Sequence, residues 1–465
     1  MVSYLPKIIL PNNDQAKVDY AALDRALRRR LNDCSAGDED YWSFRRDADR
    51  ENAHSYLHYP AMMVPKMQRA LIGAIDQIYP ITGLLDPYMG SGTALTEAMI
   101  RGIDFTGCDI NPLAVLICKA KSGPFLPKEL AASINLLNGD IARDSSTVIE
   151  ADFAYLDKWF GRDMQLQLSR IRRSIRRRKY KWMRRFYWVA LAETVRLVSN
   201  SRTSTYKLHT RTQEEITARS LDAVATFHAI VRANYVQYCS LTEILQRSGY
   251  LLNGDYVGAV NIYCRDSRRL NQTGTNAPTS NLLLTSPSYG DNETTVPYGQ
   301  YSYLPLQWID LADIGHDVDE SFLATTHEID HRSLGGSKRI TSTTVTDLCD
   351  KSTSLRRFLH KIRQQPRDRT NRVVAFCRDL DASIDPIMSM LSSNGIMAWT
   401  VGNRKVGGHR LPIDCILVEL LKDRKAKEVK RLSRTIPSKR MPVKNKISET
   451  MSTETVLVLR KDEIP

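Results

Sequence analysis

An acidic residue and two glycines occupy set positions after a short apolar run in ITGLLDPYMGSGT (81–93). The pattern predicts a strand that ends at Asp86, a turn with Gly90 and Gly92, and then a helix. Such a turn places backbone N–H groups and a carboxylate at the carboxyl end of a sheet, where open α/β folds bind ligands. Its glycines let the backbone approach a ligand that a Cβ atom would exclude. The candidate cofactor-binding residues of this turn are Asp86, Pro87, Tyr88, Gly90, Ser91, Gly92 and Thr93.

A second acidic residue follows the next apolar run, where IDFTGC (103–108) leads directly into Asp109 and Ile110. A carboxylate at the tip of a second strand can accept two hydrogen bonds from a ribose diol. No Lys follows Gly92 as it does in a nucleoside triphosphate loop, and the full G-x-G-x-x-G pattern of dinucleotide binders is missing. The alternative interpretation is a tight strand–helix turn, with Asp109 acting only as a helix cap before Pro112.

Two further strand ends carry polar residues in the second half of the chain. YVGAVNIYC (256–264) leads to Asp266 and Ser267, where a carboxylate could meet an adenine amino group. Three carboxylates at successive strand ends suit an adenosine-bearing cofactor that has no phosphate to neutralise. S-adenosylmethionine is such a cofactor, because its diol, its adenine amino group and its cationic end all bind acceptors. SNLLLT (280–285) leads to a fourth polar turn, formed by Ser286, Pro287, Ser288 and Tyr289.

The basic residues are concentrated in one segment. The chain has 66 Lys and Arg against 52 Asp and Glu, which gives a net charge of +14. Residues 169–211 contain 14 of the basic residues and a single acid, Glu193, so the remainder of the chain is almost neutral. This concentration predicts a surface that binds a polyanion, although a solvated charged face is the alternative. The candidate DNA-binding residues are Arg172, Arg173, Arg176, Arg177, Lys179, Lys181, Arg184, Arg185 and Arg202.

Aromatic residues interleave with these cations, which suits nucleic acid because phosphate-binding cations then lie beside rings that can stack on bases. A helix core is the alternative role, and we expect most of the rings to be buried. The aromatic residues are Tyr180, Trp182, Phe186, Tyr187 and Trp188.

The alternation of strand and helix on either side of this basic segment predicts an α/β fold. The pattern is helical throughout from about 125 to 255, whereas Val373–Phe376 and Thr455–Leu459 read as further strands. We therefore divide the chain into an N-terminal helical segment (1–53), a first core part (54–124), a helical insertion (125–255), a second core part (256–421) and a basic C-terminal segment (422–465).

Several classes of protein are disfavoured by the sequence. No apolar run approaches the roughly 20 residues that span a bilayer, and the first residues lack a signal-peptide pattern. The eight cysteines form no C-x-x-C pair, which indicates reduced thiols in a cytoplasmic protein without a metal site.

The motifs DPYMGSGT, GCDINP and TSPSY resemble those of the class I amino-DNA methyltransferases. HYPAMMVP, with Tyr59, Pro60 and Ala61, is similar to the segment that covers the cofactor in that family. The resemblance implies a doubly wound Rossmann-like methyltransferase sheet with a large helical insertion that recognises the target. It also implies S-adenosylmethionine as cofactor, double-stranded DNA as substrate and pairing with a restriction endonuclease. The resemblance leaves the recognition sequence, and the choice between monomer and dimer, undetermined.

In this family, the turn that corresponds to Ser286–Tyr289 receives a base flipped out of the duplex. Ser at the first position is more usual for enzymes that act on cytosine N4, and Asp or Asn for those that act on adenine N6. Ser288 departs from the family by standing where a second Pro is usual. Tyr289 is expected to stack on the target base. We therefore favour N4-methylcytosine formation, with adenine N6 methylation, an RNA or tRNA base methyltransferase, and a non-catalytic DNA-binding homologue as alternatives.

Overall fold

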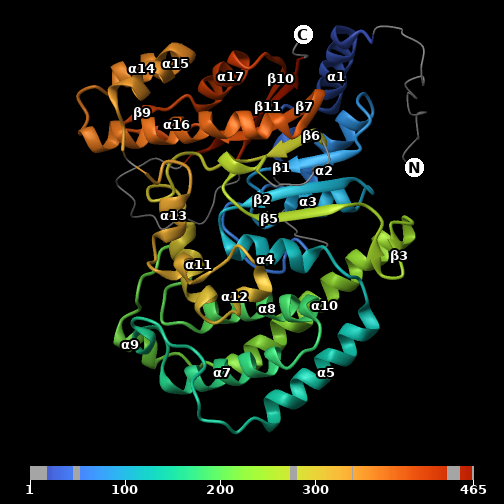
Figure 1. The fold of residues 1–465 in the computed structure, drawn as a ribbon, viewed down its shortest axis with the longest axis vertical. Coiled ribbons are helices and arrows are strands. Elements are labelled where there is room, and N and C mark those ends of the chain that lie inside the picture. Colours follow the sequence, from blue (N-terminus) through green and yellow to red (C-terminus); the bar gives the residue numbers. More distant parts are fainter. Residues whose placement is uncertain (1–17, 45–52, 273–279, 338, 437–450, 463–465) are drawn as a thin grey trace.

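A seven-stranded sheet forms the centre of the computed structural model, which describes residues 18–44, 53–272, 280–337, 339–436 and 451–462 (Figure 1). The strand order is β10-β11-β7-β6-β1-β2-β5. Leu84 pairs in parallel with Phe105 on one side and Leu282 on the other, so the strand before the glycine turn is central. The parallel strands are β1 (Gly83–Asp86), β2 (Asp104–Asp109), β5 (Val260–Cys264), β6 (Ser280–Thr285) and β7 (Leu391–Gly402).

Two antiparallel strands, β10 (Ala426–Thr435) and β11 (Thr453–Lys461), extend the sheet beyond β7. The core therefore does not end at residue 421, where the sequence led us to place its boundary. Part of β10 alternates between exposed Arg431 and Ser433 and buried Leu432 and Arg434, which is how so basic a segment forms a strand. The rest of the basic segment, 437–450, and residues 1–17 and 45–52 of the N-terminal segment lie outside the described residues.

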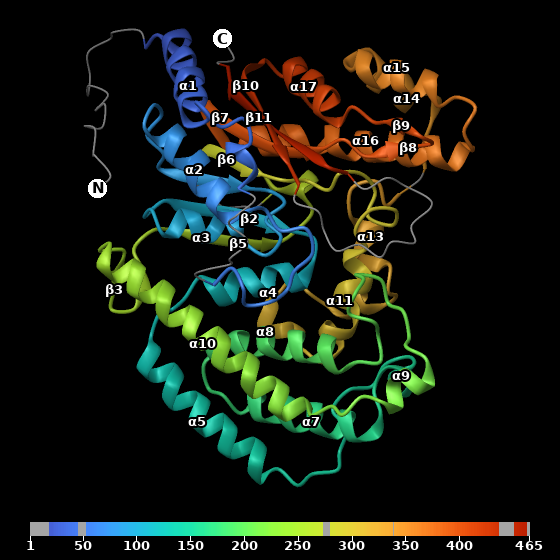
Figure 2. The ribbon, with the colours of Figure 1, turned by 180° about the vertical axis from the view of Figure 1, so that it is seen from behind.

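Helices cover both faces of the sheet, which confirms the predicted doubly wound α/β fold (Figures 1 and 2). Neighbouring residues of β1 point into opposite cores, Leu84 into one and Leu85 into the other. The first core contains residues of α1 (Tyr20–Cys34), α2 (Pro65–Asp76), α3 (Thr93–Met99) and α4 (Pro112–Lys121). The second contains residues of α14 (Ser342–Lys351), α15 (Thr353–Lys361), α16 (Arg367–Ser389) and α17 (Ile413–Asp423).

The strand predicted at Val373–Phe376 is wrong, because these residues lie inside the long helix α16. A short apolar run of this kind suits a buried strand and a buried helix equally well. Leu380, Ile384 and Ile387 are also buried, so the apolar positions continue at helical spacing along α16.

The predicted helical insertion forms a bundle built around α8, whose contacts reach both the bundle helices and α4 of the core. Phe186, Tyr187 and Trp188 are buried there, as expected, whereas Tyr180 is half exposed. Figure 2 shows the bundle below α4, and the two share one hydrophobic core, so the insertion is fused to the sheet domain. The bundle helices are α5 (Pro127–Arg143), α6 (Leu156–Trp159), α7 (Arg162–Arg176), α8 (Lys181–Val198), α9 (Gln213–Thr217) and α10 (Ala223–Arg247).

Short elements complete the described chain, in which no helix is both long and apolar enough to cross a membrane. The helical ones are η1 (Tyr41–Ser43), η2 (Ser267–Arg269), α11 (Tyr298–Gln307), α12 (Leu311–Ile314), η3 (Glu320–Leu323) and α13 (Glu328–Arg332). Two small hairpins are formed by β3 (Leu251–Leu252) with β4 (Asp255–Tyr256), and by β8 (Lys405–Val406) with β9 (His409–Arg410).

Candidate active site

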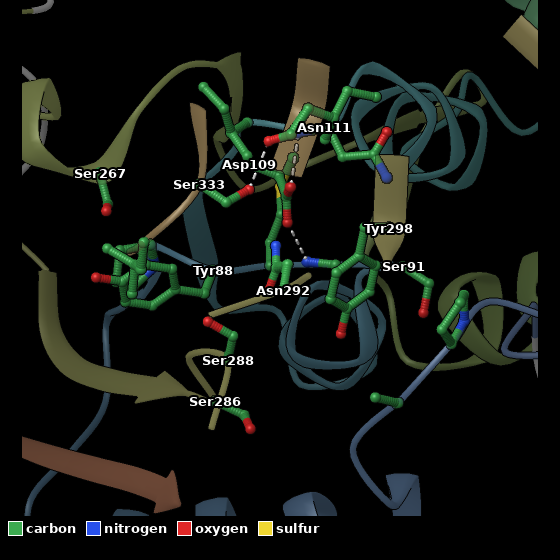
Figure 3. Close-up of a pocket in the computed structure, with 18 of the residues that line it drawn as sticks. Tyr88, Ser91, Asp109, Asn111, Ser267, Ser286, Ser288, Asn292, Tyr298 and Ser333 are labelled. Atoms are coloured by element: carbon green, nitrogen blue, oxygen red, sulfur yellow. Dashed lines mark hydrogen bonds between the residues drawn. The ribbon is translucent and has the colours of Figure 1, made fainter. Parts of the chain in front are cut away.

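A cavity of about 850 Å³, counted out to its open mouth, lies at the carboxyl ends of β1, β2, β5 and β6. Segments far apart in the sequence line it, as Figure 3 shows for ten labelled residues. The predicted residues on its wall are Tyr59, Pro60, Ala61, Pro87, Tyr88, Gly90, Ser91, Thr93, Asp109, Ile110, Asp266, Ser267, Ser286 and Ser288. The four polar turns of the sequence therefore meet at one place.

Asp109 lines this cavity and is held by two backbone amides. Its Oδ2 accepts a hydrogen bond from Gly90 N at 2.9 Å, and its Oδ1 accepts one from Asn111 N at 2.8 Å. Gly90 has a φ of +48°, a conformation that L side chains rarely adopt. Burial raises the pKa of Asp109 to about 6. Each carboxylate oxygen has a second lone pair, so the group can still accept hydrogen bonds from a ligand.

Asp86 and Gly92 do not line the cavity. Asp86 is fully buried beneath it, where its Oδ1 accepts hydrogen bonds from the Thr285 hydroxyl at 2.6 Å and from Tyr88 N at 3.2 Å. Gly92 has a φ of +76°, and a Cβ atom there would come within 2.8 Å of Cys118 Sγ in α4. Both residues therefore shape the turn from below, because the strand end and the helix start pack on their neighbours.

The predicted covering segment closes one side of the cavity through Tyr59. This ring stacks on Tyr298 of α11 with centroids 5.7 Å apart, and its hydroxyl accepts a hydrogen bond from Asn111 Nδ2 at 3.0 Å. Four residues before this segment, His54 Nε2 makes a buried contact of 3.1 Å with Glu97 Oε1 in α3. Burial lowers the pKa of His54 despite that contact.

Helix α16 positions the two side chains on the opposite side. Tyr88 donates a hydrogen bond from its hydroxyl to Ser383 Oγ of α16 at 2.7 Å. Asp266, the predicted partner of an adenine amino group, is bound by Arg268, with Nε 2.8 Å from Oδ2. Arg268 Nη1 in turn lies 3.1 Å from Asp379 Oδ1 of α16. Asp266 is therefore held in place on the cavity wall.

In the predicted catalytic turn, Ser286–Tyr289, Ser286 and Ser288 line the cavity but Pro287 and Tyr289 do not. The Tyr289 hydroxyl lies 3.2 Å from Ser286 Oγ and donates to Glu454 Oε1 of β11 at 3.0 Å. The ring lies beside Gly402 of β7, so close that a Cβ atom there would meet it at 2.6 Å. The structure thus places the ring against β7 and β11, not over the cavity where we expected it to stack on a base.

Sequence reasoning missed several residues of the wall. Asn292 is one of them: it lies between Asp109 and Ser288 in the view of Figure 3, and its buried Oδ1 has no hydrogen-bond partner among the described residues. Its position six residues after Ser286, in the loop GDNETT, was the only signal in the sequence. The other missed residues are Met62, Met63, Met89, Asn111, Arg265, Tyr298, Ile329, Arg332, Ser333 and Leu334.

Comparison with protein-family models found no match. Among curated proteins, the type II methyltransferase M.MvaI of Kocuria varians is 31% identical over 460 residues, which cover 95% of this chain and 97% of that protein. The chain belongs to the type II methyltransferases. Among solved structures, the rRNA methyltransferase aviRa from Streptomyces viridochromogenes aligns over 90% of this chain and 96% of that one, with 11% identity and a TM-score of 0.30. That similarity is too low to support a conclusion.

In this methyltransferase, most arginines that we expected to contact DNA bind acids of the chain itself. Arg173 pairs with Asp144 at 2.8 Å, Arg184 with Asp313 at 2.7 Å and Arg202 with Glu215 at 3.2 Å. These acids all lie outside residues 169–211, so a count of charges within that segment overstated its free positive charge. Further contacts join Arg176 to Glu150 and Asp310, Arg172 to the Glu150 carbonyl and Arg185 to the Asp313 carbonyl.

Three cations at the turn between α7 and α8 differ from this pattern. Arg177 and Lys179 are exposed and Lys181 is partly exposed, and no described acid forms an ion pair with them. Lys179 lies 5.3 Å from the ring centroid of exposed Tyr180. This turn therefore carries three neighbouring cations without an ion pair to a described acid.

Proposed function

We propose that this type II methyltransferase transfers a methyl group from S-adenosylmethionine to the N4 atom of a cytosine flipped out of double-stranded DNA. The natural context is a modification enzyme that protects DNA from a partner restriction endonuclease. The observation that carries the proposal is that Ser286 and Ser288 share one cavity with Asp109 and Gly90. A base on the first pair would then meet a cofactor on the second.

The cavity fits the cofactor in the chemistry of its wall. Asp109 would accept the two ribose hydroxyls, and Asp266 would accept the adenine amino group beside the ring of Tyr88. Asn292 Oδ1, buried without a described partner, offers a further acceptor on the same wall. When bound, S-adenosylmethionine supplies an electrophilic methyl group.

The residues of the predicted catalytic turn would activate the amino nitrogen of the base, which is a weak nucleophile. An exocyclic amino nitrogen is poorly nucleophilic because its lone pair is delocalised into the ring. Ser286 Oγ and the Pro287 carbonyl would accept the two amino hydrogens and so direct the lone pair toward the methyl donor. Transfer is then in line and is accelerated by positioning and by fixed dipoles. No residue of the chain forms a covalent bond to the base in this route.

The DNA backbone would be bound at the turn between α7 and α8, by Arg177, Lys179 and Lys181. Uncompensated cations beside an exposed ring suit phosphates and unstacked bases. Arg176 and Arg184 instead join the bundle to the core through Asp310 and Asp313, which would keep a recognition element at a constant distance from the cavity.

The deciding experiment incubates the purified protein with methyl-labelled S-adenosylmethionine and unmethylated duplex DNA, followed by digestion to nucleosides. We expect label in N4-methylcytosine, and its loss in Ser286→Ala with cofactor binding retained. Label in N6-methyladenine would overturn the assignment of the base. Label in RNA but not in DNA would overturn the substrate, and a protein that binds the cofactor without transfer would be a non-catalytic homologue.

A further inference from the structure

A chain of three hydrogen bonds runs from the cavity wall to the antiparallel edge of the sheet. Ser286 Oγ lies 3.2 Å from Tyr289 Oη, which lies 3.0 Å from Glu454 Oε1. The other carboxylate oxygen of Glu454 accepts from Arg434 Nη1 at 2.6 Å. The side chains of Arg434 and Glu454 are only 5% and 13% exposed, so water competes little for these bonds. Two strands of the C-terminal segment thus reach the catalytic turn.

The donor and acceptor in each bond follow from the hydrogens that each group carries. An arginine side chain can only donate and a carboxylate can only accept. Tyr289 has one hydroxyl hydrogen, and Glu454 takes it, so the Tyr289 oxygen is left as an acceptor for Ser286. The hydrogen of Ser286 therefore points toward Tyr289, and its lone pairs remain free for a ligand in the cavity.

We propose that Glu454, acting through Tyr289, is a positioning residue that holds Ser286 as a hydrogen-bond acceptor for the amino group of the target base. The proposal rests on the function proposed above. A serine hydroxyl can rotate, and in the opposite orientation it would offer its hydrogen to the amino lone pair. That lone pair must be free to attack, so the orientation of one hydroxyl hydrogen decides whether the turn assists the reaction.

Glu454→Gln tests the proposal because Arg434 dictates how the new amide is oriented. The guanidinium can only donate, so it takes the amide oxygen and leaves the NH₂ group facing Tyr289. Tyr289 then donates to Ser286, and the Ser286 hydrogen turns toward the substrate. We expect kcat to fall about tenfold or more, with the affinities for S-adenosylmethionine and DNA unchanged.

Tyr289→Phe distinguishes an effect on the orientation of the Ser286 hydroxyl from an effect on folding. It keeps the ring beside Gly402 but removes the link, so Ser286 rotates freely and kcat falls less than in Glu454→Gln. The double variant should show the kcat of Tyr289→Phe, which means that the second substitution restores part of the activity lost in Glu454→Gln. A merely structural role of Glu454 gives losses that multiply. Glu428→Gln, which removes the same charge beside Arg431 on β10, is the matched control and should retain the wild-type kcat.

The results distinguish this proposal from the function on which it rests. A wild-type protein that methylates no DNA contradicts the proposed function, and this proposal with it. A wild-type protein that methylates DNA, with Glu454→Gln at the same kcat or with multiplicative losses in the double variant, overturns this proposal alone.

Discussion

Asp86 at the end of β1 and Thr285 at the end of β6 are joined by a 2.6 Å hydrogen bond across 199 residues of sequence. This bond joins the glycine turn of the first core part to the predicted catalytic turn of the second, beneath the cavity. The other oxygen of Asp86 is buried without a hydrogen-bond partner among the described residues. The carboxyl group therefore connects the two halves of the site and remains incompletely satisfied.

The raised pKa of Asp86 should make the free energy of unfolding depend on pH. Burial raises the pKa of Asp86 to about 7 from an ordinary value of 3.8. Between these values the folded protein keeps a proton that the unfolded chain releases, so the free energy of unfolding falls as pH rises and levels off above about 7. Asp86→Asn should flatten this slope in denaturant titrations across that range. The slope that remains at lower pH belongs partly to Asp109, whose pKa is raised to about 6. An unchanged slope near neutral pH would contradict the prediction.

Asp109 should control cofactor affinity. Asp109→Asn replaces one acceptor oxygen by an NH₂ donor, and we expect the Kd for S-adenosylmethionine, measured by calorimetry, to rise roughly ten- to a hundredfold. Because the pKa of Asp109 is raised to about 6, the wild-type affinity should also weaken below that pH as the carboxylate is protonated. Asp104→Asn, at the opposite end of β2, is the control. Equal affinities in the two variants would remove Asp109 from the binding site.

Asp313 should hold the helical bundle on the core. Its carboxylate accepts hydrogen bonds from Arg184 Nη2 at 2.7 Å and from Trp188 Nε1 at 2.8 Å. Burial alone would raise the pKa of Asp313, but the hydrogen bonds from those two side chains lower it overall. Asp313→Ala strands both donors and should reduce the free energy of unfolding by about 3 kcal/mol or more.

The matched control for this loss is Glu243→Ala, which breaks an exposed pair with Arg247 on α10. That change should alter the free energy of unfolding by no more than about 1 kcal/mol. Thermal or urea denaturation measures both, and similar losses would contradict the anchoring role of Asp313.

The sequence predicted what local patterns determine and missed what depends on distant packing. Strand ends with acids and glycines predicted β1, β2, β5 and β6, because buried parallel strands are continuous apolar runs that end in polar turns. Val373 and Val374 form a similar run inside α16, where only the burial of residues further along identifies a helix. The strand predicted at Thr455–Leu459 lies inside β11 and is confirmed. β10 was missed, because its pairing with β11 is not encoded locally.

The partners of charged and polar side chains were likewise not predictable from local sequence. Arg184 seemed free because no acid lies near it in the sequence, yet Asp313 meets it 129 residues later. Likewise, Asn292 carries no recognisable motif, and only the folded chain places it in the wall of the same cavity as Asp109 and Ser288. Spacing identifies a turn, but the partners of a side chain come from tertiary structure.

The three cations at the turn between α7 and α8 should contribute to DNA binding. Substituting Arg177, Lys179 and Lys181 together by Ala should weaken binding to all duplex sequences alike. It should also reduce the slope of log K against log salt by about 0.9 for each phosphate that the variant no longer neutralises. Fluorescence anisotropy at several salt concentrations measures both quantities. Arg247→Ala removes an exposed cation that pairs with Glu243 and should leave the slope unchanged. A triple variant with the wild-type slope would place the DNA elsewhere.

The unpartnered side-chain oxygen of Asn292 should destabilise the free protein, and a bound ligand should remove this penalty. Its side-chain oxygen is buried on the cavity wall without a described hydrogen-bond partner, and such a group carries the full penalty of lost hydration. Asn292→Leu, of similar size, removes this penalty but also the side-chain hydrogen bond from Asn292 to Asp330, so the Tm of the free protein should change little while kcat/KM falls about tenfold. Asn281→Leu is the opposite case, because its amide oxygen already accepts from Thr82 N at 3.0 Å, and Tm should fall. If Asn292→Leu lowered Tm and left kcat/KM intact, Asn292 would be a structural residue, and the acceptor on this wall would have to be sought among the other side chains that face the cavity.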